Sequence, residues 1–295
     1  MPSFTSSSRT VLVTAALALA IYAAVIALWR PTIHLYPDQD ASNLARAERV
    51  LIGEGDPHTV ILGSSLGVRI PDDWLPAGWL NASLGGKGAA TGLALLRASS
   101  MRPRRILVET NTFDLGPDLA FVQDAQGPIP LALRTWVPGL RAEYRPINLL
   151  LSLAGRARGG AHAHRGSGSL AEACLSLQAQ VQGDIVSAEI VGREVARLTA
   201  RPVPSGLVAR MVDWRAALRA EQERGVEVIL FEWPVDPEVM RSPRAAAIRT
   251  TVAETLPTLR FLRLDGEGLA TEDGLHLAPV SARHAACALL HAVGG

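Results

Sequence analysis

The chain has 295 residues, of which 48% are hydrophobic and 19% charged; it can bury a core and is not a disordered chain. Its net charge of +1 lacks the basic excess of a nucleic-acid-binding surface, so no nucleic-acid partner is expected. Cys174 and Cys287 form neither a CxxC motif nor a Cys/His cluster, which excludes the usual zinc sites. We expect two buried thiols, although one disulfide stays open as the alternative.

The first thirty residues contain an apolar stretch long enough to cross a membrane. Val11 to Trp29 is 19 residues without a charged side chain, and about 20 apolar residues in a helix span roughly 30 Å of hydrocarbon. We expect residues 1–30 to be an uncleaved signal-anchor that crosses the inner (cytoplasmic) membrane once, through residues 11–29, with the main domain on the periplasmic side. A cleaved signal peptide is the alternative, because Ala18-Leu19-Ala20 has the small-x-small pattern of a cleavage site.

The rest of the chain alternates between strand-like and helix-like segments. Residues 31–55 are expected to form a linker and a leading helix, which Asp40 or Ser42 can cap and which ends near Leu51. From residue 56 to residue 295, apolar runs predict strands at 58–62, 79–83, 105–109, 226–231 and 260–264. Helical patterns occur at 89–99, 207–224, 244–255 and 279–293. This alternation is typical of an α/β domain with a parallel sheet covered on both faces.

The stretch from about 115 to 205 interrupts this alternation and is expected to be a helical insertion or lid. Apolar patterns predict helices at 131–140 and 147–157. The start of the second helix, near Pro146, is strongly apolar; it either presents a face to the membrane or a partner, or covers an edge of the sheet. In the glycine-rich loop at 159–168, His162 and His164 have no neighbouring carboxylate or cysteine. We interpret them as solvated loop residues rather than metal ligands.

Residues suited to nucleophilic chemistry lie after the first predicted strand and before the last helix. Gly63-Ser64-Ser65-Leu66-Gly67 follows the strand, at the sheet edge where open α/β folds place their ligands. A serine there can be a nucleophile that needs a base, or simply a helix N-cap. Asp273-Gly274-Leu275-His276 can supply that base, because an Asp and a His three residues apart in a tight turn can point the same way.

Two further loops can complete such a site. Asn81-Ala82-Ser83-Leu84-Gly85-Gly86 follows the second predicted strand, and a glycine there lets a backbone N–H approach a reacting oxygen closely. Asn111 follows the third predicted strand, and its side-chain amide can be another donor. Trp233 follows the fourth predicted strand; it is a weak candidate for stacking on a sugar ring, with packing beside Pro234 as the alternative.

These four blocks, in this order, resemble the SGNH/GDSL hydrolase superfamily. The similarity extends from about Asp56 to the C-terminus, apart from the insertion. Residues 63–66 resemble the first block, residues 81–86 the second, Asn111 the asparagine of the third, and residues 273–276 the last. The chain departs from the family pattern at three positions, with Ser64 in place of Asp, Glu109 in place of Gly and Thr112 in place of Asp.

The resemblance implies a flavodoxin-like three-layer α/β/α fold and an acyl-serine mechanism. It makes Ser65 the nucleophile, His276 the base and Asp273 the carboxylate that orients the base. The N–H groups of Ser65 and Gly86 and the amide of Asn111 would form the oxyanion hole, and no metal or organic cofactor is needed. The departures place the chain nearer to divergent membrane-anchored bacterial members, some of which acylate or deacylate cell-surface polysaccharides, often beside a multi-spanning membrane acyltransferase.

We therefore expect a serine-dependent O-acetyltransferase or esterase that uses an acyl donor and an extracytoplasmic cell-surface glycan. The anchor slightly favours the transferase. An esterase or lipase for small or lipid esters is the second interpretation, favoured if the insertion exposes an apolar slot for an acyl chain. A non-catalytic assembly protein of a polysaccharide-modification complex is the third, with the insertion as its partner surface.

Overall fold

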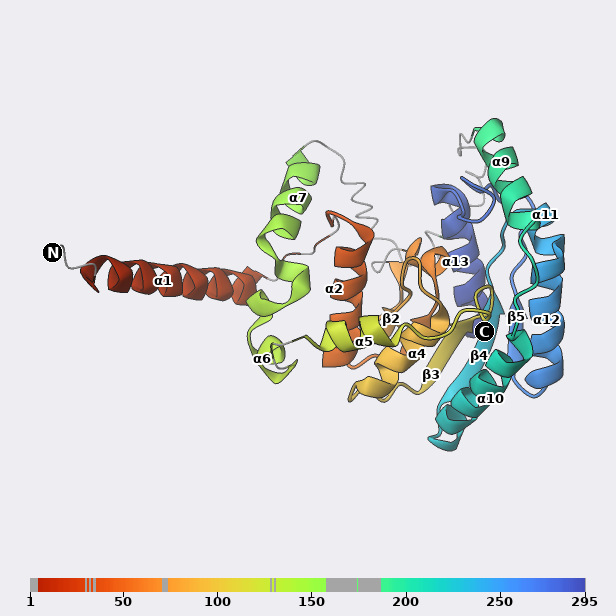
Figure 1. Cartoon of the computed structure of the whole chain (residues 1–295), viewed down its shortest axis with the longest axis horizontal. Coiled ribbons are helices and arrows are strands. Elements are labelled where there is room, and N and C mark those ends of the chain that lie inside the picture. Colours follow the sequence, from red (N-terminus) through yellow and green to blue (C-terminus); the bar gives the residue numbers. More distant parts are fainter. Residues whose placement is uncertain are drawn as a thin grey trace.

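The computed structural model describes residues 5–29, 31, 33, 36–70, 74–127, 129, 131–157, 174 and 187–294. Its centre is a five-stranded sheet in which all neighbouring strands are parallel, in the order β2-β1-β3-β4-β5 (Figure 1). The strands are β1 (Thr59–Leu62), β2 (Trp79–Asn81), β3 (Arg105–Glu109), β4 (Glu227–Glu232) and β5 (Arg260–Arg263). The expected α/β domain with a parallel sheet is confirmed.

The two faces of the sheet bury two separate hydrophobic clusters, because successive residues of a strand point to opposite faces. Val60, Ile106 and Val228 belong to one cluster, whereas Ile61 and Leu107 belong to the other. The first cluster is completed by helices α2 (Gln39–Ile52), α4 (Ala89–Ala98), α5 (Leu119–Gln126), α10 (Leu207–Glu223) and α12 (Pro243–Thr255). The second is completed by α3 (Ser65–Val68), α9 (Ala188–Thr199), α11 (Pro237–Arg241) and α13 (Pro279–Gly294).

The strand order fixes where a ligand can bind. From β1 the chain proceeds to β2 on one side, and from β3 it proceeds to β4 and β5 on the other. The direction of winding therefore reverses between β1 and β3. Doubly wound sheets bind their ligands outside the carboxyl ends of the strands at such a reversal. Ser65 follows β1 and Asn111 follows β3, so both candidate residues lie at this point.

The connection between β3 and β4 contains most of the expected insertion, and it contributes to the core. α5 and α9 pack into the two clusters, through Val122 and Val195 among others. The helix predicted at 131–140 is broken, because Pro138 disfavours a helical conformation in the residue before it. The segment instead forms α6 (Leu131–Trp136) and the 3₁₀ turn η2 (Pro138–Leu140). The loop with His162 and His164 lies outside the described residues.

Four elements of this connection form a separate group at the base of the N-terminal helix. They are α6, η2, η3 (Ala142–Tyr144) and α7 (Pro146–Ala157), and we call residues 131–157 the collar (Figure 1). Ion pairs join the collar to α2 and to the turn after it: Arg134 pairs with Glu48 of α2, both buried, and Arg141 pairs with the partly exposed Glu54. The N-cap of α2 is Asp38, whose carboxylate accepts a hydrogen bond from Ala41 N, rather than the predicted Asp40 or Ser42.

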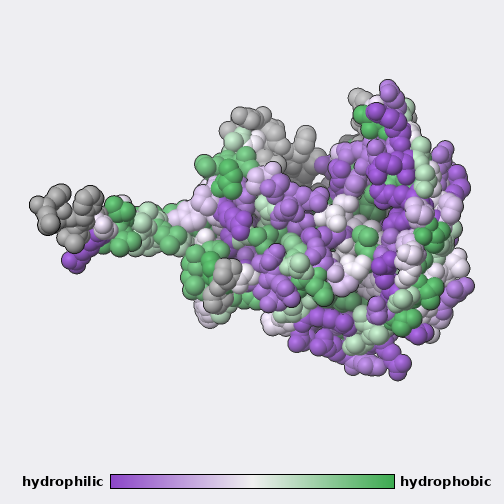
Figure 2. Space-filling model, viewed as in Figure 1, coloured by the Kyte–Doolittle hydropathy of each residue, from purple (hydrophilic) through white to green (hydrophobic). Residues whose placement is uncertain are grey.

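Helix α1 (Thr5–Trp29) projects away from the domain (Figure 1). Its apolar part, Ser8–Trp29, is 22 residues long, enough for a membrane span or a signal sequence. Apolar side chains gather along it and on parts of the collar next to it (Figure 2). Its last turns contact the collar: Ile26 is fully buried in a cluster with Ile33 and Tyr144.

Cys174 and Cys287 form a disulfide, so the expectation of two free thiols was wrong. Their Cα atoms lie 5.7 Å apart, within the range that a disulfide needs. The sequence could not indicate this pairing, because it depends on the fold bringing residue 174 beside α13 across 113 residues. Since structural disulfides persist in oxidising compartments, the disulfide and α1 together are consistent with an extracytoplasmic domain.

The disulfide should contribute measurably to stability. Cys287→Ser, or reduction of the bond, should lower the free energy of unfolding by about 2–4 kcal/mol, because the unfolded chain then gains conformational freedom. Denaturant unfolding of the full chain with and without reductant measures this difference. The double variant Cys174→Ser/Cys287→Ser is the control, since reductant should not change its stability. Equal stability of the oxidised and reduced wild-type chain would contradict the expectation.

Candidate functional site

The structure brings together the three residues predicted as nucleophile, base and orienting carboxylate. His276 Nε2 lies 2.8 Å from Ser65 Oγ, and His276 Nδ1 lies 2.7 Å from Asp273 Oδ2. If Nδ1–H donates to the carboxylate, Nε2 is left as the acceptor for the Ser65 hydroxyl. All three residues are partly exposed, so a substrate can reach the Ser65–His276 pair.

Ser64, rather than Ser65, has the N-cap role that the sequence left open for a serine. Ser64 is the N-cap of α3, and its Oγ accepts a hydrogen bond from Leu66 N at 3.3 Å. Ser65 is the first residue of that helix, so its hydroxyl is available to His276. α3 has only four residues, and its dipole is correspondingly small. The base is therefore what can activate Ser65.

Glu109, at the end of β3, holds the turn that carries the serines. Its Oε2 accepts a hydrogen bond from Ser64 N at 2.9 Å, and its Oε1 accepts one from Ser64 Oγ at 2.5 Å. Thr112 Oγ1 lies 3.5 Å from the same Oε1. All three positions that depart from the SGNH-like pattern thus lie together in one hydrogen-bonded group, in which Ser64 and Glu109 are buried. The sequence marked each position separately but gave no sign of this contact.

The surroundings of Glu109 favour its protonated form. The carboxyl is completely buried, and this burial raises its pKa from 4.5 to about 7, although the hydrogen bonds from Ser64 act in the opposite direction. Gly63 leaves the room that Glu109 occupies, because a Cβ there would lie 2.6 Å from Glu109 Oε2 and 2.7 Å from Ser83 Oγ. The close packing of this turn therefore restricts where the backbone of Ser65 can lie.

The loop with Asp273 and His276 is also held firmly. Asp273 Oδ1 accepts hydrogen bonds from His276 N at 2.7 Å and from Leu275 N at 3.0 Å, which closes the tight turn. Gly274 has a φ of +80°, which favours glycine, and a Cβ there would lie 2.5 Å from Val195 Cγ2 of α9. The expected insertion therefore packs directly on the loop that carries His276.

The surroundings of Asp273 favour its ionised form. Its partial burial would raise its pKa, but the hydrogen bonds from the backbone and ring of His276 and from Leu275 N outweigh this and lower the pKa below its usual value. A carboxylate that stays ionised at neutral pH can orient the imidazole and stabilise its charged form.

The three predicted oxyanion donors differ in whether they already make hydrogen bonds. In the described part of the chain, the N–H groups of Ser65 and Gly86 have no hydrogen-bond acceptor. The side chain of Asn111 is tied to Trp233, since its Nδ2 donates to Trp233 O at 3.0 Å and its Oδ1 accepts from Trp233 N at 2.8 Å. These bonds fix the orientation of the amide and use one of its two Nδ2 hydrogens, which leaves the second for an oxyanion.

Helix α2 supports the loop that contains Gly86, a contribution that the sequence did not indicate. Asn43 is buried; its Oδ1 accepts from Gly85 N and its Nδ2 donates to Gly85 O, both at 2.8 Å. The side chain of Gln39 lies against Gly85 and Gly86. The sequence predicted a leading helix here. It could not indicate the hydrogen bonds between Asn43 and Gly85, because these residues are 42 positions apart.

Trp233 packs in the core rather than facing a sugar. Only 2% of it is exposed, and its ring packs edge-on against Phe231 with 5.0 Å between centroids. The predicted stacking role is therefore wrong and the packing alternative describes this residue. Its backbone contributes to the site instead, through the two hydrogen bonds to Asn111.

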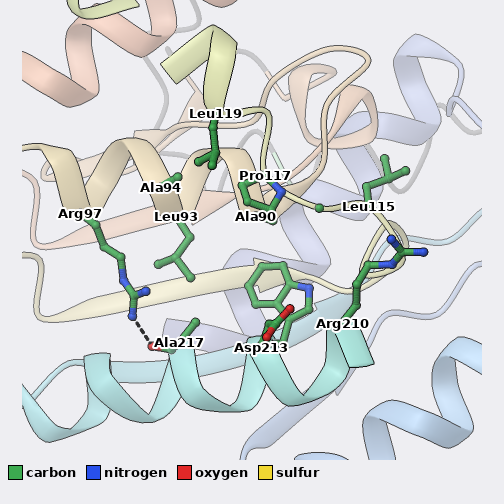
Figure 3. Close-up of a pocket in the computed structure, with 12 residues that line it drawn as sticks. Ala90, Leu93, Ala94, Arg97, Leu115, Pro117, Leu119, Arg210, Asp213 and Ala217 are labelled. Carbon is green, nitrogen blue, oxygen red and sulfur yellow. Dashed lines mark hydrogen bonds between the residues drawn. The ribbon is translucent and has the colours of Figure 1, made fainter. Parts of the chain in front are cut away.

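A cavity of about 380 Å³ lies between α4, α10 and the loop that precedes α5 (Figure 3). Its lining is mostly apolar, with Arg97 and Asp213 among the polar residues, and Arg97 Nη2 donates to Ala217 O at 2.7 Å. Neither Ser65 nor His276 lines this cavity. It therefore does not provide an acyl slot at the serine.

Glu109 should make stability depend on pH in a defined direction. Between pH 4.5 and about 7 the folded chain holds a proton on Glu109 that the unfolded chain releases. The unfolding free energy should therefore fall as pH rises through this window, by about 3 kcal/mol. Glu109→Gln mimics the protonated acid, so its stability relative to wild type should rise by that amount from pH 4.5 to 7 in denaturant unfolding experiments.

Asp118 serves as a control because its pKa is shifted in the opposite direction from that of Glu109. Its pKa is lowered from 3.8, mainly by the hydrogen bond from Lys87, so the stability that it adds is lost only as pH falls below 3.8. Asp118→Asn should leave the difference from wild type constant between pH 4.5 and 7. A constant difference for Glu109→Gln as well would show that Glu109 titrates normally in the folded chain.

Comparisons with known proteins do not assign the chain to a family. No family model matches it, and no curated protein or solved structure matches it either. We therefore argue its function from the arrangement of Ser65, His276 and Asp273 and from the fold that places them.

Proposed function

We propose that the chain is a serine-dependent acyl-ester enzyme that forms an acyl intermediate on Ser65. The observation that carries this proposal is the continuous hydrogen-bonded path from Ser65 Oγ through His276 to Asp273, with both links under 3 Å. A serine hydroxyl is a poor nucleophile without a base. A histidine aligned between a serine and an ionised carboxylate is the arrangement that removes the hydroxyl proton during attack.

The acylation step uses each of these groups once. Ser65 Oγ attacks the carbonyl carbon of an ester while its proton moves to His276 Nε2, and Asp273 stabilises the imidazolium. The carbonyl oxygen becomes an oxyanion, for which the N–H groups of Ser65 and Gly86 and the free Nδ2 hydrogen of Asn111 are the candidate donors. Each such donor contributes on the order of 3 kcal/mol in comparable sites. As the C–O bond breaks, His276 protonates the departing alkoxide.

Release of the acyl group repeats these steps with a second oxygen nucleophile. His276, neutral again, removes a proton from water or from a sugar hydroxyl, which attacks the acyl-serine. Collapse of the second oxyanion returns the proton to Ser65 Oγ. Water gives an esterase, and a sugar hydroxyl gives an O-acyltransferase. This chemistry uses only side chains and backbone of the chain.

The resemblance to the SGNH/GDSL superfamily supports this proposal at the level of fold and residues. Strand order 2-1-3-4-5, which flavodoxin-like sheets have, is the one observed, and the residues of the four blocks lie at the carboxyl edge of the sheet. Ser64 and Glu109 explain how the chain can depart from the family pattern at both positions. The carboxyl group that the first block lacks is supplied by the neighbouring strand, in hydrogen-bonding contact with Ser64.

An extracytoplasmic glycan is the proposed acceptor, modified beside the inner membrane. The apolar helix α1 and the disulfide support an extracytoplasmic location for the domain. Helix α1 would then anchor the domain in the membrane, and a multi-spanning membrane acyltransferase would be a suitable source of the acyl group. The resemblance to membrane-anchored members that modify cell-surface polysaccharides is the reason for naming this substrate class.

The serine mechanism predicts which variants lose activity. Ser65→Ala and His276→Ala should each abolish turnover of an activated acetyl ester by the purified full chain, because the nucleophile or its base is missing. Asn111→Ala should lower the rate roughly 10²–10³-fold through loss of one oxyanion donor. Ser99→Ala is the control; the Oγ of this buried serine donates to Leu96 O and accepts from Met101 N, and the variant should leave the rate unchanged. Substantial turnover by Ser65→Ala would rule out the mechanism.

The acyl intermediate can be sought directly. Mass spectrometry after brief exposure to the activated ester should find one acetyl group on the peptide that contains Ser65, and none in the Ser65→Ala variant. Adding a glycan with free hydroxyls should divert the acetyl group from water to sugar if the chain is a transferase. Acetylation at another residue, with Ser65 unmodified, would contradict the proposed nucleophile.

A further inference from the structure

Helix α7 of the collar buries polar side chains and exposes apolar ones. Its polar residues Asn148 and Ser152 are 0% and 4% exposed, one turn apart on its inner face. Asn148 Nδ2 donates to Ala142 O at 2.8 Å. On the outer face, Ile147 and Leu150 are 49% and 63% exposed. A surface helix in water shows the reverse pattern, so its outer face is suited to an apolar environment.

Helix α6 has the same inverted pattern. Arg134 is 4% exposed and points inward, where it forms the ion pair with Glu48 and donates to Ala125 O at 3.1 Å. Its neighbours Leu133 and Trp136 point outward, 46% and 83% exposed. Leu131 of α6 and Leu149 of α7 do pack inward. The apolar side chains on the outer faces of both helices have no such contact with the two clusters of the sheet.

The turns η2 and η3, which connect α6 to α7, contact the end of α1 within its apolar part, and Leu149 of α7 packs beside the Ile26 cluster. A Cβ on Gly139 of η2 would lie 3.1 Å from Ala23 Cα, and Tyr22 donates a hydrogen bond to Tyr144 O. These α1 residues precede Trp29 by about two turns. In Figure 1, α6 and α7 lie to either side of α1, and α7 runs across its direction. Figure 2 shows apolar surface on these same parts.

We propose that the outer face of the collar, formed by Leu133, Trp136, Ile147, Leu150 and Leu153, docks on the lipid surface of the membrane that α1 enters. Continuity with α1 is the reason to choose lipid as the occupant. If α1 spans the bilayer, any element that contacts it two turns inside its apolar part lies at the depth of the headgroups and upper acyl chains. Trp136 then has the interfacial position that tryptophan prefers, and α7 lies in the plane of the interface.

The proposal also requires that α1 is retained. Removal of α1 would strip Ile26 and Tyr22 from the cluster with Tyr144 and expose further apolar surface on the collar. In this arrangement α1 and the collar form one unit that fixes the orientation of the domain at the membrane. The proposal does not depend on the acyl-serine chemistry.

Photo-crosslinking in membranes tests this surface. A photoreactive phenylalanine analogue replaces Leu150 in the full chain, expressed in cells whose phospholipids carry radioactive phosphate. In a second variant the analogue replaces Trp136. Irradiation should attach labelled phospholipid to the protein in both variants. Val208 on α10 is the matched control, because it is equally apolar and 68% exposed but lies outside the collar. No labelled adduct should form in the control variant, in which the analogue replaces Val208.

Each other outcome overturns the proposal. Adducts between position 150 and another protein would mean that a protein partner covers this face. Absence of lipid adducts at positions 136 and 150, in a chain with its disulfide formed, would mean that the face meets water. An intact mass showing that the chain starts after Trp29 would remove the anchor. Position 147, on the same face, is the second site if the variant at position 150 does not accumulate.

Discussion

The hydrogen bonds between Glu109 and Ser64 are the constraint on which the site depends. They join the carboxyl ends of β1 and β3, the two strands between which the winding of the sheet reverses. Because Ser65 follows directly in the chain, its backbone has little freedom once this pair has formed. The loop with Asp273 and His276 needs only to reach one fixed point, and its own internal hydrogen bonds allow it to do so.

Much of the fold and the candidate site could be predicted because the decisive signals are local in sequence. Short buried strands followed by Ser65 or Asn111 indicate a parallel sheet and its functional edge together, and the Asp273–His276 spacing closes within a single turn. The register of the sheet then brings these distant segments to the same place. The five predicted strands, and the helices predicted at 89–99, 207–224, 244–255 and 279–293, lie within a few residues of the observed ones for the same reason.

The remainder of the site depends on contacts that have no local signature. Asn43 pairs with Gly85 across 42 residues, and Cys174 pairs with Cys287 across 113. Trp233 follows a strand, as a ligand-binding residue often does, but its ring turns inward against Phe231. Glu109 was noticeable only as an unusual residue in a family pattern. In each case the three-dimensional neighbour decides the role, and composition or periodicity cannot identify that neighbour.

The position of the β3–β4 pairing has a consequence for how the chain folds. β1, β2 and β3 are close in sequence, so the half of the sheet that carries Ser65 and Glu109 can form early. β4 must pair with β3 across more than a hundred residues, and pairings of long sequence separation form slowly because of the chain entropy that they cost. His276 lies beyond that step. We therefore expect Ser65 to meet His276 only after β4 has paired with β3.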